Sequence, residues 1–134
     1  MYICIMNNEG RILKHKNMST TAENLIEVIE PYRSDMVLAV ECIFTWYWIA
    51  DLCSQIGVKF VLGHALYMKA IHGGKVKNDK IDSQKIAAML LGGMLPMAYV
   101  YPQHMRSTRN LLRRRLYIAR QKAELQTHIQ NTNT

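Results

Sequence analysis

Three carboxylates have the positions and spacing that divalent-metal chemistry requires. Glu41 directly follows the apolar run Met36–Val40, and Asp79 and Asp82 stand three residues apart in a polar segment. Ligand sites in open α/β sheets gather at the carboxyl ends of strands, and residues at i and i+3 share one face of a helix. Two acids on a helix face, opposed by a third at a strand end, would form an oxygen-rich site for Mg²⁺ or Mn²⁺. A pair of such ions could activate a nucleophile and stabilise a leaving phosphate oxygen.

Each of these carboxylates also has a simpler explanation. Glu41 is compatible with a solvated strand end. Asn78 or Asp79 can cap the helix, and Asp82 can complement the dipole of its first turn. By spacing alone, both explanations stay open.

The positive charge is concentrated toward the end of the sequence. Residues 1–100 hold ten Lys and Arg against nine Asp and Glu, whereas residues 101–134 hold seven against Glu124 alone. A focused basic helix favours a polyanion such as nucleic acid, although a solvated helix face explains the same charge. The candidate nucleic-acid contacts are Lys75, Lys77, Lys80, Arg106, Arg109, Arg113, Arg114, Arg115 and Arg120. The three lysines can instead simply balance the nearby carboxylates.

The elements that position these residues follow from patterning. Weakly alternating segments on both sides of the turn Asn7–Gly10 predict a β-hairpin. The run Ser19–Thr21 offers an N-cap, with capping-box spacing between Thr20 and Glu23, and predicts the start of a short helix that ends near Pro31. The apolar runs Met36–Val40 and Val58–Leu62 predict two buried strands.

A helix over residues 44–56, closed by Gly57, separates those two strands and predicts a parallel pair with a right-handed crossover. Further helices are expected over residues 64–71 and 78–91. A long helix is expected from Gln103 to about Gln130, in which apolar residues recur at sevens. Its stripe contains Met105, Leu112 and Ala119 beside Leu111, Ile118 and Leu125. The stripe needs a partner, either the rest of the domain or a second chain, which predicts a homo-oligomer through this helix.

Composition bounds the class of protein. The 134 residues suit one domain with a real core, and the longest uncharged apolar stretch is too short to span a bilayer. No membrane partner is therefore expected, and three cysteines without CxxC spacing indicate a reducing cytoplasm. His64 and His72 are a poor metal pair, and Trp46 and Trp48 are expected to pack in the core.

Several segments resemble the DEDD transposases of the insertion sequence 110 family. Residues 77–87 are similar to its K-x-D-x-x-D-A-x-x-(I/L)-A block, and residues 91–102 to its "G-x-(L/I)-P … V-x-x-P" segment. Arg106 and the run Leu111–Arg115 are similar to the start of its basic helix. The segment Val40–Tyr47 is similar to the block that holds its acidic glutamate.

The resemblance implies an RNase H-like (RuvC-like) α/β domain over residues 1–100 and the start of a helical linker over residues 101–134. It implies a DEDD-type site in which Glu41, Asp79 and Asp82 are catalytic and bind Mg²⁺ or Mn²⁺, as part of a two-metal site. It also implies DNA as the partner in transposition, possible use of a structured guide RNA, and a bacterial cytoplasmic setting.

The sequence departs from the family pattern at both ends. The family's first aspartate lies on an opening strand, whereas this chain starts inside the expected second strand. By the same comparison, the domain that bears the family's nucleophilic serine is expected to be missing. These departures predict a fragment that does not cut or recombine DNA by itself. They also predict a sheet that lacks its first strand, so that residues 2–6 would shift inward to pair directly with residues 36–40.

Two other functions compete with a transposase domain. One is a non-catalytic nucleic-acid-binding remnant that uses the basic helix. The other is a plain α/β domain whose last helix mediates dimerisation. Metal titration separates the transposase domain from the other two functions. Salt-dependent binding separates the nucleic-acid-binding remnant from the dimerisation domain.

Overall fold

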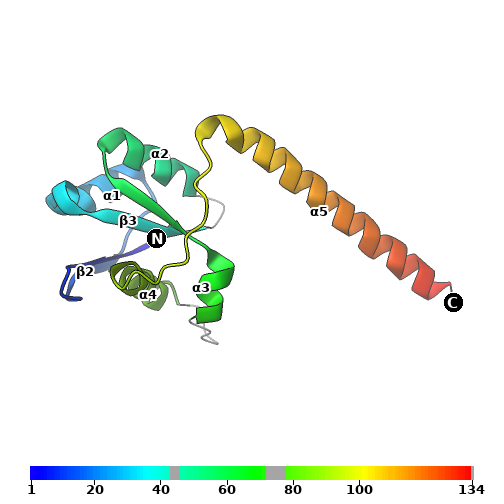
Figure 1. Cartoon of the computed structure of the whole chain (residues 1–134), viewed down its shortest axis with the longest axis horizontal. Helices are drawn as coiled ribbons and strands as arrows, with labels where there is room; N and C mark the ends of the chain where they lie inside the picture. The colour runs from blue at the N-terminus through cyan, green and yellow to red at the C-terminus, as the bar shows by residue number, and fades with distance from the viewer. Residues whose placement is uncertain (43–45, 72–77, 134) are drawn as a thin grey trace. The chain divides into compact units, whose positions relative to one another are not determined.

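The computed structural model describes residues 1–42, 46–71 and 78–133, which divide into two compact units (Figure 1). Unit 1 spans Met1–Val100 and contains the strands and most of the helices. Unit 2 spans Tyr101–Thr134 and contains one helix, α5 (Gln103–Thr132). The long helix predicted to end near residue 130 therefore forms, and it ends at Thr132.

The predicted hairpin is confirmed, with β1 (Tyr2–Met6) antiparallel to β2 (Ile12–Asn17). Its turn closes through a 3.0 Å hydrogen bond from the Gly10 amide to the Asn7 carbonyl. The Asn7 side chain also accepts a 2.8 Å hydrogen bond from the Arg11 amide. Gly10 has a φ of 81°, which a residue with a side chain rarely adopts, and this explains a glycine at the turn.

Helix α1 (Ala22–Ile29) begins one residue later than the capping-box spacing predicted. The N-cap is Thr21, whose Oγ1 accepts from the Asn24 amide at 3.3 Å. The cap therefore lies within the predicted run Ser19–Thr21, but the predicted capping box of Thr20 with Glu23 was wrong, because Glu23 is then at N2 and not at N3. After α1 the chain continues into the 3-10 helix η1 (Glu30–Asp35), whose fixed φ at Pro31 suits its first turn.

The predicted parallel pair is confirmed. Strand β3 (Val37–Glu41) pairs with β4 (Lys59–Gly63) in a register that joins Val37 to Lys59 and Glu41 to Gly63. Helix α2 (Trp46–Ile56) connects them, and Gly57 follows it with a φ of 73°. The short helix α3 (Ala65–Ile71) and the helix α4 (Asp79–Leu91) complete unit 1.

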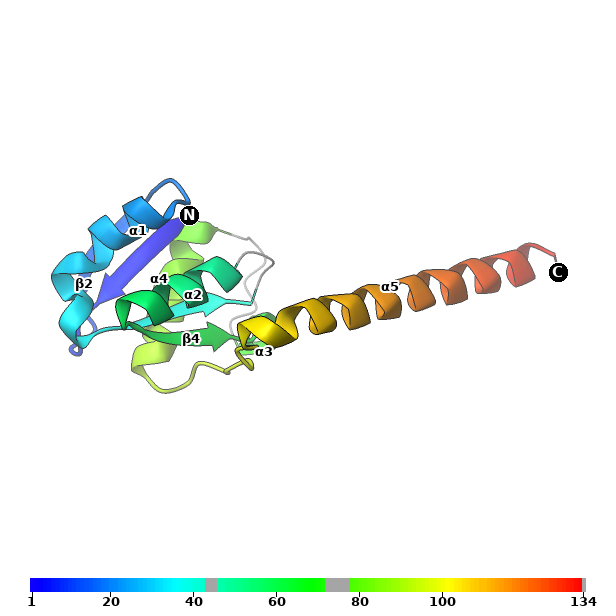
Figure 2. The same cartoon turned by 90° about the horizontal axis from the view of Figure 1, so that it is seen from above.

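The predicted inward shift of the hairpin was wrong. Within the described ranges, β1 pairs only with β2 and β3 pairs only with β4, so the strands form two separate sheets. Figure 2 shows β1 running in the opposite direction to β3 and β4. The two sheets are joined through side chains, since Ile3 of β1 and Leu38 of β3 belong to one apolar cluster.

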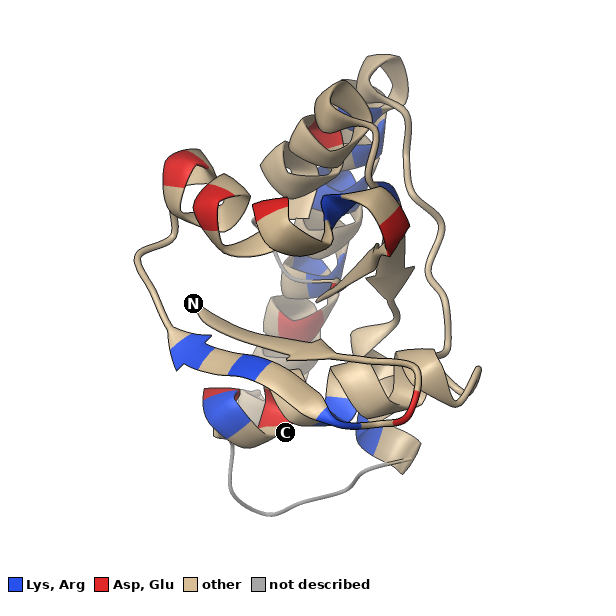
Figure 3. Cartoon of the chain, turned by 90° about the vertical axis from the view of Figure 1, so that its left-hand side faces the viewer, with Lys and Arg blue, Asp and Glu red and all other residues tan. Residues whose placement is uncertain are grey.

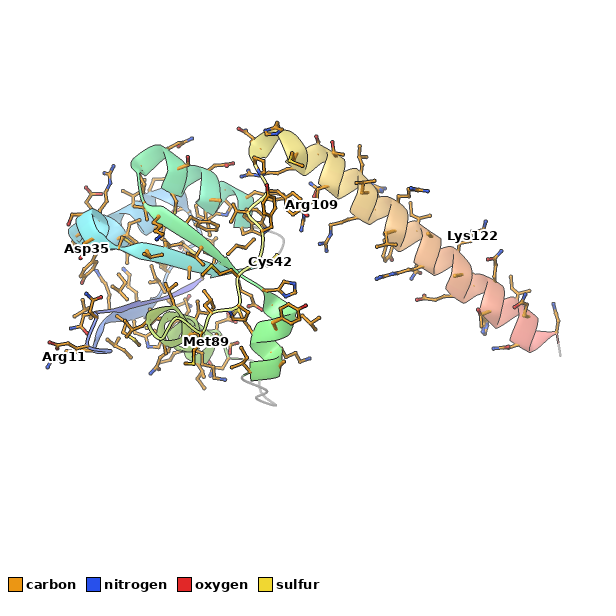
Figure 4. All side chains as sticks on the ribbon, in the orientation of Figure 1. Arg11, Asp35, Cys42, Met89, Arg109 and Lys122 are labelled. Carbon is orange, nitrogen blue, oxygen red and sulfur yellow. The ribbon has the colours of Figure 1, made fainter. Side chains whose placement is uncertain are left out.

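That cluster lies on one face of the β3–β4 sheet. Leu38 and Val58 pack there with Ile29 of α1 and Ile49 and Cys53 of α2. On the opposite face, Ala39 and Val61 pack against three buried residues, which are Met68, Met89 and Leu95. Met89 belongs to α4, so the pair of strands is covered on both faces (Figure 4).

The Cys53 thiol makes the stability of this core depend on pH. Burial raises the pKa of the Cys53 thiol from 9.0 to about 11, so the unfolded chain ionises this thiol first. The contribution of the buried, neutral thiol to the free energy of unfolding is fully present below pH 9. It is lost as the pH rises from 9 through 11. Since one pKa unit corresponds to about 1.4 kcal/mol, the loss amounts to about 3 kcal/mol. Urea unfolding at pH 8 to 11 should show a steeper decline for the wild type than for Cys53→Ala. Parallel curves would contradict this assignment.

Candidate acidic site and basic helix

Glu41 lies on the same face of the β3–β4 sheet as α4. It is the last residue of β3 and its register partner in β4 is Gly63. A Cβ atom built on Gly63 would lie 2.7 Å from Sδ of Met68 and 3.3 Å from Cδ1 of Leu95. Paired residues of neighbouring strands point to the same face, so the half-buried side chain of Glu41 lies on the face where α4 packs.

Asp79 and Asp82 lie in the first turn of α4, as the spacing predicted. The cap of this helix is Asn78, whose Oδ1 accepts from the Lys80 amide at 3.0 Å. The Asp79 side chain is therefore not needed as a cap. Both carboxylates still complement the positive end of the helix dipole, so that simpler explanation applies to each of them.

A second contact holds the same turn against the hairpin. His15 Nε2 of β2 lies 2.9 Å from the Lys80 carbonyl oxygen and 3.1 Å from Ser83 Oγ. The Ser83 hydroxyl donates to the same carbonyl at 2.8 Å. The imidazole also packs edge-on against Tyr2, with ring centroids 5.5 Å apart. Sequence reasoning missed His15, because no local pattern links it to a helix 65 residues away.

The three carboxylates form an all-oxygen donor set, which suits Mg²⁺ or Mn²⁺. However, the described part of the chain contains no group of three or more His, Cys, Asp or Glu side chains placed to hold a metal ion. Glu41 thus lies at a strand end on the face that α4 covers, and Asp79 and Asp82 lie in the first turn of α4. Within the described ranges they do not make a closed metal site. Their role as metal ligands stays a prediction.

The lysines predicted to contact nucleic acid are only partly described. Lys80 is exposed in the first turn of α4, between the two aspartates. Lys75 and Lys77 lie outside the described residues, as does His72. Lys80 therefore adds one positive charge to a turn that carries two negative charges.

The arginines of α5 fall into two groups. Arg106 Nε donates to the Tyr101 carbonyl at 3.0 Å, and the Arg109 guanidinium lies 4.8 Å from the centre of the Tyr101 ring. These two contacts fix the start of the helix. The remaining basic side chains are exposed, and they are Arg113, Arg114, Arg115, Arg120 and Lys122. Figure 3 shows basic residues recurring along α5, and Figure 4 shows Lys122 pointing away from it.

The apolar stripe of α5 is also exposed. The exposed fraction is 70% for Leu111, 57% for Ile118 and 61% for Leu125. A helix with such a stripe needs a partner to bury it. The homo-oligomer stays a prediction.

Trp46 and His64 both make aromatic contacts. Trp46 is buried and stacks on Phe60 with ring centroids 6.2 Å apart, which confirms a packing role. His64 follows β4 and stacks on Tyr67 at 4.3 Å. Its buried Nδ1 has no hydrogen-bond partner among the described residues. None of the helices within the described ranges has the length and apolar character needed to cross a bilayer.

Comparison with known proteins identifies the family. A family model described as a transposase, of the DEDD type of insertion sequence 110, matches residues 1–132. The chain belongs to this transposase family. No curated protein and no solved structure matches the chain. The resemblance seen in the sequence blocks is thereby confirmed for nearly the whole length of this transposase chain.

The capping of α4 by Asn78 can be tested directly. Replacing an N-cap asparagine by alanine costs about 1 kcal/mol, whereas aspartate is an equally good cap. Asn78→Ala should therefore lower the free energy of unfolding by about 1 kcal/mol, and Asn78→Asp should not. Urea denaturation followed by circular dichroism measures both values. Equal losses in the two variants would mean that the side-chain hydrogen bond does not support the helix.

Proposed function

We propose that unit 1 is the acidic, divalent-metal-dependent part of a DNA transposase with an RNase H-like fold, and that α5 is part of its DNA-binding surface. The observation that supports the acidic site best is the placement of Glu41 on the sheet face that α4 covers. Asp79 and Asp82 begin that helix. A strand-end carboxylate and a helix-borne pair would then serve one site.

In this proposal, Glu41, Asp79 and Asp82 hold Mg²⁺ or Mn²⁺ through their carboxylate oxygens. The bound ion would supply Lewis acidity at a phosphate oxygen of DNA. If each carboxylate binds through one oxygen, the three fill only part of the octahedral shell of Mg²⁺, so water or DNA phosphate would complete it. We therefore expect weak metal binding by the chain alone and tighter binding in the presence of DNA.

The residues around the metal would have their own tasks. Lys80 lies between Asp79 and Asp82 in the sequence and is exposed, so it can contact a phosphate group that approaches the first turn of α4. Lys75 and Lys77, which the structure does not describe, are proposed for the same contact. The catalytic assignment of the three carboxylates rests on the family match together with this placement.

Metal binding tests the acidic site. Mn²⁺ titration followed by electron paramagnetic resonance should show binding to the wild-type chain. Asp82→Asn removes the negative charge of one metal ligand and should weaken Mn²⁺ binding at least about tenfold. Even residues that only support metal ligands contribute a factor of about ten to metal affinity. Glu124→Gln is the matched control, because Glu124 lies in α5 and carries the same charge. Equal affinities for the two variants would remove Asp82 from the site.

The DNA-binding surface is proposed on α5 because this helix carries seven basic residues and only one acidic residue, Glu124. A helix of 30 residues extends about 45 Å, long enough to follow a DNA backbone across about one turn. Phosphate contacts of this kind do not read sequence, so they would hold the transposase on DNA while other groups choose the site. Arg113, Arg114 and Arg115 are the strongest candidates because they are exposed and stand side by side in the sequence.

Salt dependence tests this surface. Each phosphate contact adds about 0.9 to the slope of log affinity against log salt on duplex DNA. Changing Arg113, Arg114 and Arg115 to Ala should reduce that slope by up to about 2.7 and weaken binding to all sequences alike. The control removes equal charge from exposed positions of unit 1, with Arg11, Lys16 and Lys59 changed to Ala.

The outcome distinguishes the alternatives. If the α5 triple variant and the control lose equal affinity, the effect is general charge and α5 is not the DNA surface. If the wild-type affinity is unchanged from low to moderate salt, the arginines are merely solvated. Repeating the titration with structured RNA shows whether the same arginines serve a guide RNA.

A further inference from the structure

The first turn of α4 has little apolar packing of its own. Met89, ten residues beyond Asp79, is the buried residue of this helix. Ile81, the apolar residue in the first turn, is 48% exposed. Helix α4 also lies alongside β1, but burial anchors mainly its second half and contributes little to the attachment of the acidic turn.

His15 provides that attachment. The Lys80 carbonyl oxygen can only accept a hydrogen bond, so the His15 Nε2 that lies 2.9 Å away must carry the proton and donate it. Ser83 Oγ lies 3.1 Å from the same nitrogen and donates its own proton to the Lys80 carbonyl. The contact thus joins the middle of β2 to the backbone between Asp79 and Asp82.

The other side of the imidazole is held as well. Tyr2 lies edge-on to the ring, and Cys4 is the register partner of His15 in the antiparallel ladder. The donor of the hydrogen bond is therefore an imidazole that is held by Tyr2 and by the pairing of β2 with β1. A donor held in this way can set the position of a helix end more sharply than a flexible side chain could.

We propose that His15 is a positioning residue that fixes the acidic first turn of α4 against the hairpin. It acts through the Lys80 carbonyl and touches neither metal nor DNA. This inference rests on the proposed function insofar as Asp79 and Asp82 are metal ligands. The attachment of the turn itself does not depend on that function.

Three variants of the full chain test the proposal. His15→Gln keeps an N–H donor at the end of the side chain, whereas His15→Leu removes it. His15→Asn is polar but too short to bring its amide to Lys80, and it serves if the leucine variant does not fold. His128→Leu, on exposed α5, is the control for the loss of a histidine.

Two measurements are made on each variant. Hydrogen exchange follows the amides of Asp82, Ser83 and Gln84, with those of β4 as an internal reference. Mn²⁺ titration gives the dissociation constant. We expect His15→Leu and His15→Asn to speed exchange in the first turn at least tenfold with β4 unchanged, and to weaken Mn²⁺ binding. His15→Gln should restore both, and His128→Leu should match the wild type.

Other results would overturn the proposal. Unchanged exchange in the first turn of α4 would show that His15 does not hold it, and equal acceleration in β4 would show a general loss of stability. Failure of His15→Gln to rescue would mean that the donor is not the important feature. If the wild-type chain binds no Mn²⁺, the proposed metal site fails, while the exchange data still decide whether His15 positions the turn.

Discussion

The arrangement of unit 1 depends on the packing of helices across two small sheets that share no backbone ladder in the described part of the chain. A sheet usually transmits its geometry through hydrogen bonds between neighbouring strands. Here, side chains do that work: Ile3 and Leu38 meet in one apolar cluster under α1 and α2. On the opposite face of the β3–β4 pair, α4 packs through Met89 against Ala39 and Val61.

This constraint explains why α4 is the element on which chemistry can depend. Its buried second half is tied to β3 and β4, and its first turn is tied to β2 through His15. The helix therefore connects the two sheets. The same helix begins with the Asp-x-x-Asp pair, so any change in how the sheets sit against each other would also move these carboxylates. A polar contact at one end and apolar contacts at the other make a helix whose position is determined at both ends.

The distribution of charge separates two kinds of contact with a polyanion. Unit 1 is nearly balanced, and three of its carboxylates lie at the end of one strand (Glu41) and the start of one helix (Asp79 and Asp82). Helix α5 is strongly basic and almost without acid. A balanced unit can admit a metal ion and a phosphate at one place, while a basic helix attracts nucleic acid along its length without regard to sequence. That division is consistent with the transposase family to which the chain belongs.

Much of the local structure could be predicted from the sequence, because it depends on near neighbours. Gly10 and Gly57 take the positive φ angles expected of their turns, and the two apolar runs form a parallel pair. The Asp-x-x-Asp spacing placed both acids in one helical turn. The family could be recognised from short sequence segments that are similar to its conserved blocks. The capping box of α1 was assigned to the wrong threonine, since Thr20 and Thr21 are chemically alike and only the backbone geometry chooses between them.

Only the tertiary structure decided how these elements meet. The alternation of β1 is equally compatible with pairing to β2 alone or with an added ladder to β3, and in the described part of the chain β1 pairs with β2 alone. The contact between His15 and Lys80 joins residues 65 positions apart, so no periodicity or cap signal contains it. A sequence specifies each element through neighbours within a few residues. The relative positions of strand ends, helix ends and carboxylates depend on which apolar faces can be buried together. Burial of those faces involves residues from the whole length of unit 1 and cannot be inferred from local sequence.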